Sequence, residues 1–298
     1  MIQPEALLQQ YFGHKAFRAG QKQAIDAILS GRDVLAVMPT GAGKSVCYQI
    51  SALLLPGVTI VISPLISLMK DQVEALRQVG IPAAYINSSI SQEEFYHSMQ
   101  MLQQGQCRIL YVAPERLMTE SLLRLAQRVQ ISMIAVDEAH CVSQWGQDFR
   151  QSYLDIPVFM EQLPVRPVCT AFTATATKQV EADIARILKL RDPETIHTGF
   201  DRKNLFFGVR RPNSKMTELF HLLKENDGKS GIVYCSTRKA VEEVCASLCD
   251  TGFDATRYHA GLSDVERAQN QDDFLYDRKP IMVATNAFGM GIDTVSYT

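Results

Sequence analysis

The sequence lacks a strong net charge and a long apolar run, and we expect no signal peptide at its start. Its 30 basic and 32 acidic side chains leave a net charge of −2, so binding of nucleic acid would require a local basic patch. No apolar run approaches the roughly 20 residues of a membrane helix. The start, Met1-Ile2-Gln3-Pro4-Glu5, has neither the basic residues nor the apolar core of a signal peptide. We therefore expect a cytoplasmic protein without a membrane partner.

The chain also lacks a cysteine pattern typical of disulfide frameworks or zinc sites. Its seven cysteines are odd in number, scattered and mostly in apolar surroundings, which indicates buried, reduced thiols. Cys245 and Cys249 lie four residues apart on a predicted helix, but the sequence offers no two further ligands nearby. The sequence therefore predicts no zinc site.

What is present is an alternation of short apolar runs and helical patterns along 298 residues, a length sufficient for two domains. This alternation is typical of parallel βαβ units. The rhythm breaks around residues 190–204, so we expect α/β domains at 1–200 and 201–298. The first should contain strands at Val34–Met38, Thr59–Ser63, Ala83–Ile86, Arg108–Val112, Met133–Asp137 and Pro167–Phe172. The second should contain strands at Asn204–Val209, Ser230–Cys235, Ala255–Tyr258 and Pro280–Ala284, and a helix that Ser263 and Glu266 open as a capping box.

A phosphate-binding loop is predicted directly after the first apolar run. The segment reads Met38-Pro39-Thr40-Gly41-Ala42-Gly43-Lys44-Ser45 and leads into a helix. Backbone N–H groups from Gly41 to Lys44 can surround a triphosphate, with the helix N-terminus adding positive charge. Lys44 would reach the β- and γ-phosphates and the Ser45 hydroxyl would bind magnesium. The strict pattern has glycine where this chain has Met38.

Two carboxylates follow a second apolar run, in the segment Asp137-Glu138-Ala139-His140. Parallel strands would bring Lys44 and Asp137 to the same edge of a sheet, where such folds bind ligands. Asp137 would then hold magnesium and Glu138 would orient or deprotonate the attacking water. His140 completes the candidate catalytic set. The alternative is a solvated acidic pair without any relation to the loop; the shared strand context favours a nucleoside triphosphatase.

The order of motifs resembles the helicases of superfamily 2 and, within them, the RecQ family of DNA helicases. Tyr11 to Gln21 (YFGHKAFRAGQ) is similar to the family's adenine-recognition motif. The Gln21 amide would donate to and accept from adenine, with Arg18 nearby and His14 where the family usually has tyrosine. The alternative for Gln21 is an exposed helix residue.

Further segments resemble the parts of RecQ helicases that contact DNA. Ser63 to Gln72 (SPLISLMKDQ), with Ser63 and Lys70, and Tyr111 to Arg116 (YVAPER) match backbone-binding segments, although a turn with a helix cap would look the same. Cys141 to Arg150 (CVSQWGQDFR) resembles the aromatic-rich loop that couples single-stranded DNA to hydrolysis through Trp145, Phe149 and Arg150. The family usually has histidine at Gln147. The alternative for Trp145, the only tryptophan, is a core anchor.

The remaining motifs complete the resemblance. Thr173-Ala174-Thr175-Ala176 is similar to the segment that links hydrolysis to domain movement. Three motifs of the second domain also resemble those of the family. They contain Thr237 and Thr285, which we expect to contact DNA phosphates, and Asp293, which we expect to face the nucleotide. The resemblance implies two tandem RecA-like domains with parallel sheets, the second incomplete at its C-terminus. It implies ATP and magnesium as cofactors, single-stranded or partly duplex DNA as partner, and 3′-to-5′ unwinding in replication, recombination or repair.

The sequence contains neither the family's arginine motif that completes the ATP site nor its zinc-ligand cluster. We therefore expect this chain alone to be a poor ATPase, with an unpaired sheet edge at the strand 280–284. Two alternatives stay open: a remnant that binds nucleotide and DNA without unwinding, and an RNA helicase of the same superfamily. Protein partners and oligomeric state are not indicated.

Overall fold

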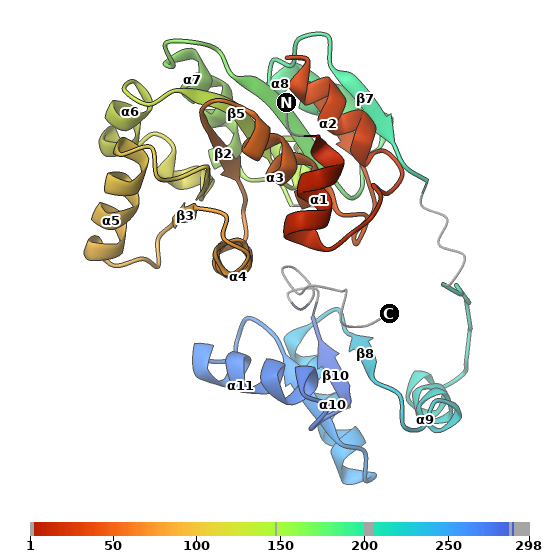
Figure 1. Cartoon of the computed structure of the whole chain (residues 1–298). Helices are drawn as coiled ribbons and strands as arrows, with labels where there is room; N and C mark the ends of the chain where they lie inside the picture. The colour runs from red at the N-terminus through yellow and green to blue at the C-terminus, as the bar shows by residue number, and fades with distance from the viewer. Residues whose placement is uncertain (1–2, 147, 200–204, 286–287, 289–298) are drawn as a thin grey trace. The chain divides into compact units, whose positions relative to one another are not determined.

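The computed structural model describes residues 3–146, 148–199, 205–285 and 288 (Figure 1). The chain divides into two compact units, the first running to Asp201 and the second beginning at Arg202. Each unit is an α/β structure with a parallel sheet. In the part of the chain that the structure describes, no helix has the length and apolarity to cross a membrane.

The first unit is built on a seven-stranded sheet in the order β3-β4-β2-β5-β6-β1-β7, with every described pairing parallel. Its strands are β1 (Val34–Val37), β2 (Val58–Ile62), β3 (Ala83–Ile86), β4 (Ile109–Val112), β5 (Ile131–Val136), β6 (Val168–Thr173) and β7 (Glu194–His197). Its helices are α1 (Pro4–Phe12), α2 (Gln21–Leu29), α3 (Lys44–Leu54), α4 (Ile66–Gln78), α5 (Gln92–Gln103), α6 (Glu120–Ala126), α7 (Asp155–Glu161) and α8 (Lys178–Ile187), with 3-10 turns η1 (Pro114–Arg116), η2 (Ala139–Val142) and η3 (Gln151–Leu154).

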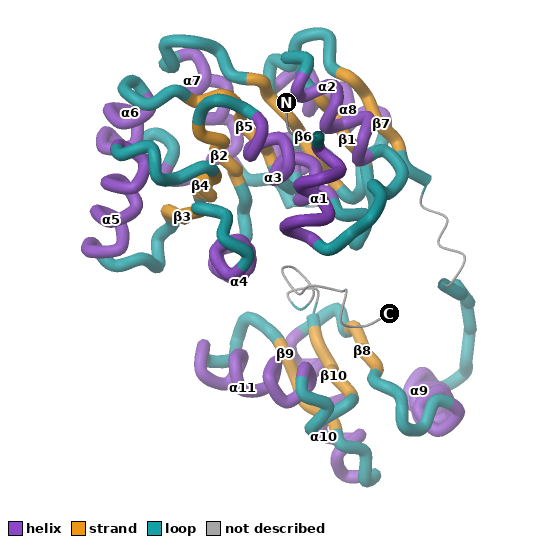
Figure 2. Tube along the Cα trace, viewed as in Figure 1, coloured by secondary structure: helices purple, strands orange, loops and turns teal. Residues whose placement is uncertain are grey.

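Helices cover both faces of this sheet, as Figure 2 shows. Apolar side chains of α1 to α4 form one core with one face, and those of α5 to α8 form another core with the opposite face. Because the central strands are buried on both faces, they are nearly continuous apolar runs, which is why they were predictable. All six strands predicted for this unit are confirmed, with ends shifted by up to two residues.

The seventh strand, β7, was not predicted. It lies in the segment where the sequence rhythm breaks, and it pairs parallel to β1 at the edge of the sheet. Of its four residues only Ile196 is buried, so the run Glu-Thr-Ile-His carries almost no apolar signal. Its position depends on long-range pairing with β1, which short-range patterns do not report.

A buried ion pair fixes the start of β1, the strand that leads to the phosphate-binding loop. Asp33 is 2% exposed, and its carboxylate accepts bonds from both terminal nitrogens of Arg166, at 3.1 and 2.6 Å. It also accepts from the backbone N–H groups of Cys169 in β6 and Arg191 before β7, at 2.8 and 2.7 Å. One carboxylate thus ties together the starts of three neighbouring strands.

In its described residues, the second unit holds a three-stranded parallel sheet in the order β8-β10-β9. Its elements are α9 (Lys215–Glu225), β8 (Gly231–Tyr234), α10 (Arg238–Asp250), β9 (Ala255–Tyr258), α11 (Asp264–Leu275) and β10 (Ile281–Ala284). The capping box of Ser263 and Glu266 is confirmed at the start of α11. The expectation of an open edge at β10 is wrong, because β10 lies between β8 and β9 and pairs with both.

The strand predicted at the start of this unit is also wrong for its described part. Asn204 lies outside the described residues, and residues 205–209 form no strand. Phe206, Phe207 and Val209 are 94%, 85% and 90% exposed. The apolar composition of this segment is typical of a strand, but a strand also requires a hydrogen-bonding neighbour, and the described sheet does not include residues 205–209.

The cysteines are unpaired, and five of the seven are buried, as predicted from their apolar surroundings. Burial raises the pKa of the Cys47 and Cys141 thiols to about 12. Cys249 is exposed and Cys235 is half-buried.

Candidate functional site

The phosphate-binding loop connects β1 to α3 and depends on two glycines with left-handed backbones. Gly41 and Gly43 have φ of +79° and +78°, and Gly43 caps the N-terminus of α3. A Cβ atom at Gly43 would lie 2.3 Å from the side-chain nitrogen of Gln21. The dihedral angle therefore favours glycine at this position, and a larger residue would also displace the Gln21 amide.

Met38, the residue at which the loop departs from the strict pattern, belongs to the sheet. Its side chain is fully buried in the core that the helices α1 to α4 form with one face of the sheet. Its N–H group donates to the carbonyl of Thr173 at 2.9 Å, which extends the β1–β6 pairing by one residue. The loop thus begins one residue later, at Pro39.

Lys44 is the first residue of α3 and crosses back over the loop. Its Nζ donates to the carbonyl oxygen of Met38 at 3.3 Å. This is a long bond to a neutral acceptor, whereas an anionic phosphate would give the ammonium a charge-assisted bond. The loop, the helix N-terminus and this ammonium suit a polyphosphate.

Asp137 follows β5 and is held at the carboxyl edge of the sheet by its N–H, which donates to the carbonyl of Ile62 at 2.8 Å. Its side chain is buried, and burial together with the charge of Glu138 raises the pKa of its carboxyl to about 7, while Lys44 acts in the opposite direction. β1 and β5 lie in one parallel sheet with β6 between them. The predicted meeting of the loop and the carboxylates at one edge is therefore confirmed.

Glu138 has a left-handed backbone, with φ of 45° and ψ of 48°. This conformation is costly for a residue other than glycine, and such strain concentrates at functional sites. Burial raises the pKa of its carboxyl. The conformation places Glu138 Oε2 3.3 Å from Nδ1 of His140.

His140 joins the carboxylates to the next motif of the first unit. Its Nδ1 also lies 3.0 Å from the hydroxyl oxygen of Thr173, at the end of β6. The Thr173 hydroxyl in turn contacts the carbonyl of Thr175 at 3.1 Å. Burial lowers the pKa of His140, which favours the neutral ring.

Gln21 is buried at the start of α2, so the alternative of an exposed helix residue is wrong. Its Oε1 accepts from the backbone N–H of Arg18 at 2.8 Å. Its Nε2 donates to the carbonyls of Ala42 and Gly43 at 3.1 and 3.0 Å. The Arg18 guanidinium donates to the carbonyl of Gly41, and His14 is exposed. This segment therefore supports the phosphate-binding loop directly.

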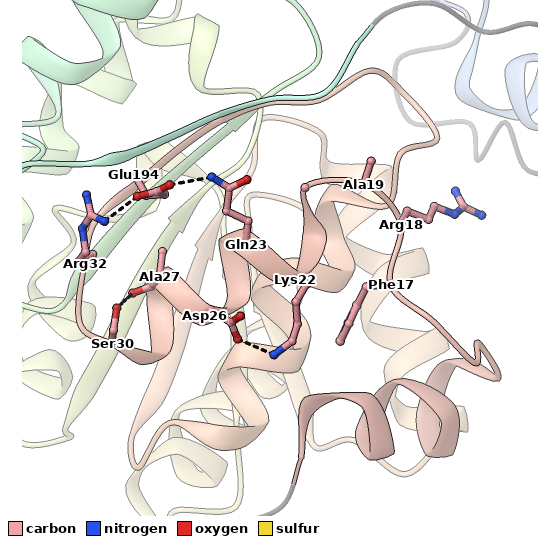
Figure 3. Close-up of a pocket in the computed structure, with 11 residues that line it drawn as sticks. Phe17, Arg18, Ala19, Lys22, Gln23, Asp26, Ala27, Ser30, Arg32 and Glu194 are labelled. Atoms are coloured by element: carbon pink, nitrogen blue, oxygen red, sulfur yellow. Dashed lines mark hydrogen bonds and ion pairs between the residues drawn. The ribbon is translucent and has the colours of Figure 1, made fainter.

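A hollow of about 730 Å³ lies along α2 and is drawn in Figure 3. Its walls are joined by polar contacts: Glu194 accepts from Gln23 and Arg32, and Lys22 pairs with Asp26. The Arg18 side chain points away from these groups (Figure 3). Arg18, one of the candidate adenine residues, is among the residues that line the hollow, whereas Gln21 and His14 are not.

The two residues predicted to contact DNA from the segment after β2 differ in access. Ser63 is 2% exposed, and its hydroxyl has no hydrogen-bond partner in the described part of the chain. The Lys70 side chain is 61% exposed on α4 and lies 3.8 Å from Glu74. Of these two side chains, Lys70 is the one that reaches solvent.

A buried polar link near this segment was not visible in the sequence. Gln49 of α3 is 3% exposed and donates to Gln72 of α4 and to the hydroxyl of Tyr111 in β4, each at 3.0 Å. It joins the helix of the phosphate-binding loop to both candidate DNA segments. A glutamine within an otherwise apolar helix stretch was the one available signal.

The aromatic loop, Cys141 to Arg150, begins within η2 and is closed at its base by the Arg150 N–H, which donates to the carbonyl of Cys141 at 2.9 Å. Trp145 is 76% exposed and Phe149 is 38% exposed, so the core-anchor alternative for Trp145 is wrong. The Arg150 guanidinium pairs with Asp148 and donates to the carbonyl of Pro64 at 3.0 Å. Gln147 lies outside the described residues.

Tyr153 ties the far end of this loop to the catalytic edge. Its ring is fully buried in η3, and its hydroxyl donates to the backbone carbonyl of Asp137 at 3.0 Å. The sequence did not single out this residue, because it lies after the segment Cys141 to Arg150 that carries the resemblance. The aromatic loop therefore begins next to the carboxylate segment, and Tyr153, shortly after the end of the loop, contacts that segment again.

Of the three candidate residues of the second unit, the structure describes Thr237 and Thr285. Thr237 is exposed, and its hydroxyl caps α10 by accepting the N–H of Ala240 at 3.1 Å. Thr285 follows β10, is half-buried, and donates its N–H to the carbonyl of Tyr258 at 3.1 Å. Asp293 lies outside the described residues. Within the described ranges no group of three or more His, Cys, Asp or Glu side chains is arranged to hold a metal.

Comparison with known proteins agrees with this geometry. Residues 18–183 match the DEAD/DEAH box helicase family and residues 214–297 match the helicase conserved C-terminal domain. ATP-dependent DNA helicase RecQ of Bacillus subtilis is 47% identical over 290 residues, covering 97% of this chain and 49% of that protein. RecQ of Haemophilus influenzae is 44% identical over 288 residues, covering 97% and 46%. The chain thus spans about half the length of these relatives.

Solved structures share the fold at low sequence identity. The DUF1998 helicase MrfA, bound to DNA, has a TM-score of 0.75 at 17% identity and covers 97% of this chain and 45% of that one. Dbp5 of S. cerevisiae, bound to RNA and ADP BeF3, has a TM-score of 0.69 at 20% identity and covers 96% and 75%. Two RecA-like helicase domains are therefore confirmed. The resemblance to RecQ helicases is confirmed as well, and the chain belongs to the DEAD/DEAH box helicase family.

Proposed function

We propose that this chain is the ATP-driven motor of a RecQ-type DNA helicase that moves 3′ to 5′ and separates strands in recombination, repair and replication, in the cytoplasm. The observation that carries the proposal is the placement of the aromatic loop. It starts directly after Asp137-Glu138-Ala139-His140, and Tyr153 returns it to the Asp137 carbonyl. A base that stacks on Trp145 would thus act on a loop fixed at both ends to the hydrolytic segment.

The nucleotide end of the site suits ATP with magnesium. Backbone groups from Thr40 to Gly43 surround the phosphates, Lys44 neutralises the terminal ones, and His14, Arg18 and Gln21 lie on the adenine side, with Asp293 as a further nucleotide contact. The Ser45 hydroxyl and the Asp137 carboxylate are the hard oxygen ligands that magnesium prefers. Bound magnesium would supply charge neutralisation across the phosphates.

Glu138 is the residue proposed to orient and deprotonate the attacking water. Burial raises the pKa of its carboxyl, which makes it a better base near neutral pH. His140 contacts both Glu138 and Thr173. It is placed to pass a change at the carboxylates to the end of β6.

The DNA end of the site is proposed at Trp145 and Phe149, whose exposed rings offer faces to unpaired bases, worth roughly 1–3 kcal/mol per base. Phosphate contacts are proposed for Ser63, Lys70, Arg150, Thr237 and Thr285. Since the Ser63 side chain is buried, its contact would come through the backbone of the segment. Partners beyond single-stranded or partly duplex DNA are not indicated.

The proposal is tested by ATP turnover of the purified chain with oligothymidylate, with oligouridylate and without nucleic acid, beside strand separation on a duplex with a 3′ tail. Stimulation by DNA above RNA, lost in Trp145→Ala, supports a DNA motor. Stronger stimulation by RNA favours the RNA helicase. ATP and DNA binding without strand separation by this chain favours the remnant. Absence of any nucleic-acid effect on ATP binding or turnover contradicts the proposal.

A further inference from the structure

A hydrogen-bonded chain connects the aromatic loop to a helix some forty residues later in the sequence. Ser143, the first residue after η2, is fully buried, and its hydroxyl donates to Oδ2 of Asp183 on α8 at 2.8 Å. The same hydroxyl oxygen accepts the backbone N–H of Trp145 at 3.2 Å. The carboxylate of Asp183 is thus two hydrogen bonds away from the backbone that carries the Trp145 ring.

Asp183 is suited to be the fixed end of this chain. Its side chain is largely buried, and its second oxygen, Oδ1, accepts from the Arg186 guanidinium at 2.9 Å. Bonds from Arg186 and then Ser143 lower the pKa of its carboxyl, which is therefore charged at neutral pH. A charged acceptor gives the Ser143 hydroxyl a stronger bond than a neutral one would.

The backbone after Ser143 is also tightly constrained. The N–H of Gly146 donates to the carbonyl of Ser143 at 2.9 Å, and a Cβ atom at Gly146 would lie 2.2 Å from the carbonyl oxygen of His140. The turn from Ser143 to Gly146 therefore leaves little freedom for the intervening backbone. A pocket of about 480 Å³ is lined both by Trp145 and Phe149 of the loop and by Gln179 and Arg186 of α8.

We propose that Asp183 is a positioning residue: through the Ser143 hydroxyl it fixes the backbone of Trp145 so that the ring stands out from the loop instead of collapsing onto α8. What the ring then meets, an unpaired base, rests on the proposed function. The hydrogen-bonded connection from Asp183 through Ser143 to Trp145 does not depend on the proposed function, because it exists in the loop without DNA. The two are therefore tested separately.

The first experiment uses Trp145 as its own probe, since it is the only tryptophan in the chain. Fluorescence anisotropy and acrylamide quenching are measured for the parent chain and for Asp183→Ala, Ser143→Ala and Asp183→Asn. The alanine variants should lower the anisotropy and change the quenching, whereas asparagine, which still offers an oxygen to Ser143, should restore most of the parent signal. Lys178→Ala is the matched control, because Lys178 is an exposed residue of the same helix that pairs with Glu181.

Anisotropy and quenching equal to the parent in both Asp183→Ala and Ser143→Ala would overturn the proposal. A fall in Asp183→Ala that Ser143→Ala does not reproduce would also overturn it, because the Ser143 hydroxyl is the proposed connection. A thermal melt of each variant identifies loss of the fold. If Asp183→Ala fails to fold, the comparison of Ser143→Ala with the parent decides.

The second experiment titrates the same proteins with oligothymidylate and follows Trp145 emission. The half-saturating concentration should rise about tenfold in Asp183→Ala, the change expected for one lost hydrogen bond to a charged group. Lys178→Ala should match the parent. If DNA leaves the parent emission unchanged while the anisotropy still falls in the alanine variants, the proposed function fails and the positioning role of Asp183 stands.

Discussion

Magnesium binding at Asp137 should weaken as the pH falls below about 7, because the pKa of its carboxyl is raised to about that value. The first cause is burial, and the charge of Glu138 adds to it, whereas the Lys44 ammonium acts against both. A protonated carboxyl cannot serve as a metal ligand, so the cation must displace the proton. Because the pKa of Asp137 is raised to about 7, the affinity for magnesium should fall on the acid side of neutrality.

The expected size follows from the fraction of Asp137 that is ionised. With a pKa of about 7, most of the carboxyl is ionised at pH 8 and about a tenth is ionised at pH 6, so the affinity for magnesium-ATP should fall about tenfold between these values. An ordinary aspartate, with a pKa of about 3.9, would be ionised at both and would give no such change. The nucleotide's own phosphate also titrates near pH 6 and must be separated from the protein's contribution.

Calorimetry at pH 8 and pH 6, in two buffers of different ionisation enthalpy, measures both the affinity and the protons released. Asp137→Asn serves as the control: it retains the shape of the side chain and cannot titrate, so its residual pH dependence belongs to the nucleotide and to neighbouring groups such as Glu138. The parent should release close to one additional proton per nucleotide at pH 6. An equal pH dependence in parent and Asp137→Asn would refute the assignment of Asp137 as a buried magnesium ligand.

Three further substitutions test other parts of the structure. Glu138→Gln should leave ATP binding intact and lower turnover by about 10²–10⁴, measured as single-turnover hydrolysis; parent-like turnover would contradict its role as base. Trp145→Ala should remove stimulation by single-stranded DNA with little change in the melting temperature, because the ring is 76% exposed, and a large fall in the melting temperature would indicate core packing. Asp33→Ala should lower the free energy of unfolding by about 3–5 kcal/mol in urea titrations, because the substitution removes the carboxylate that accepts from Arg166 and from two backbone N–H groups. A change within experimental error would show that water replaces the carboxylate.

Much of the first unit was predictable because its strands are buried on both faces. Runs such as Val34–Val37 and Val58–Ile62 are continuous or nearly continuous in apolar residues, and each is followed by residues with recognisable chemistry. β7 could not be found in the same way, since its place depends on pairing with β1 and only Ile196 is buried. The segment 205–209 shows the opposite error: a strand-like composition without a pairing neighbour in the described sheet.

The candidate site was predictable where one segment contains the chemistry. Lys44 and Asp137 each follow a buried strand, and the rule that parallel strands end at one edge was sufficient to bring them together. The burial of Gln21 against the loop carbonyls was not predictable, because it depends on how α2 packs on α3. The same holds for Ser143 and Asp183, whose contact joins distant segments that carry no shared motif.

The central claim is that the loop from Thr40 to Ser45 binds the phosphates of ATP, and one titration tests it most directly. Magnesium-ATP is titrated by calorimetry into the parent chain and into Lys44→Ala at pH 8, with a thermal melt of each protein beside it. Lys44 faces the loop through its bond to Met38 and contributes little to the core, so both proteins should melt alike. The account predicts saturable binding by the parent and loss of tight binding in Lys44→Ala; equal affinities in two equally folded proteins would contradict it.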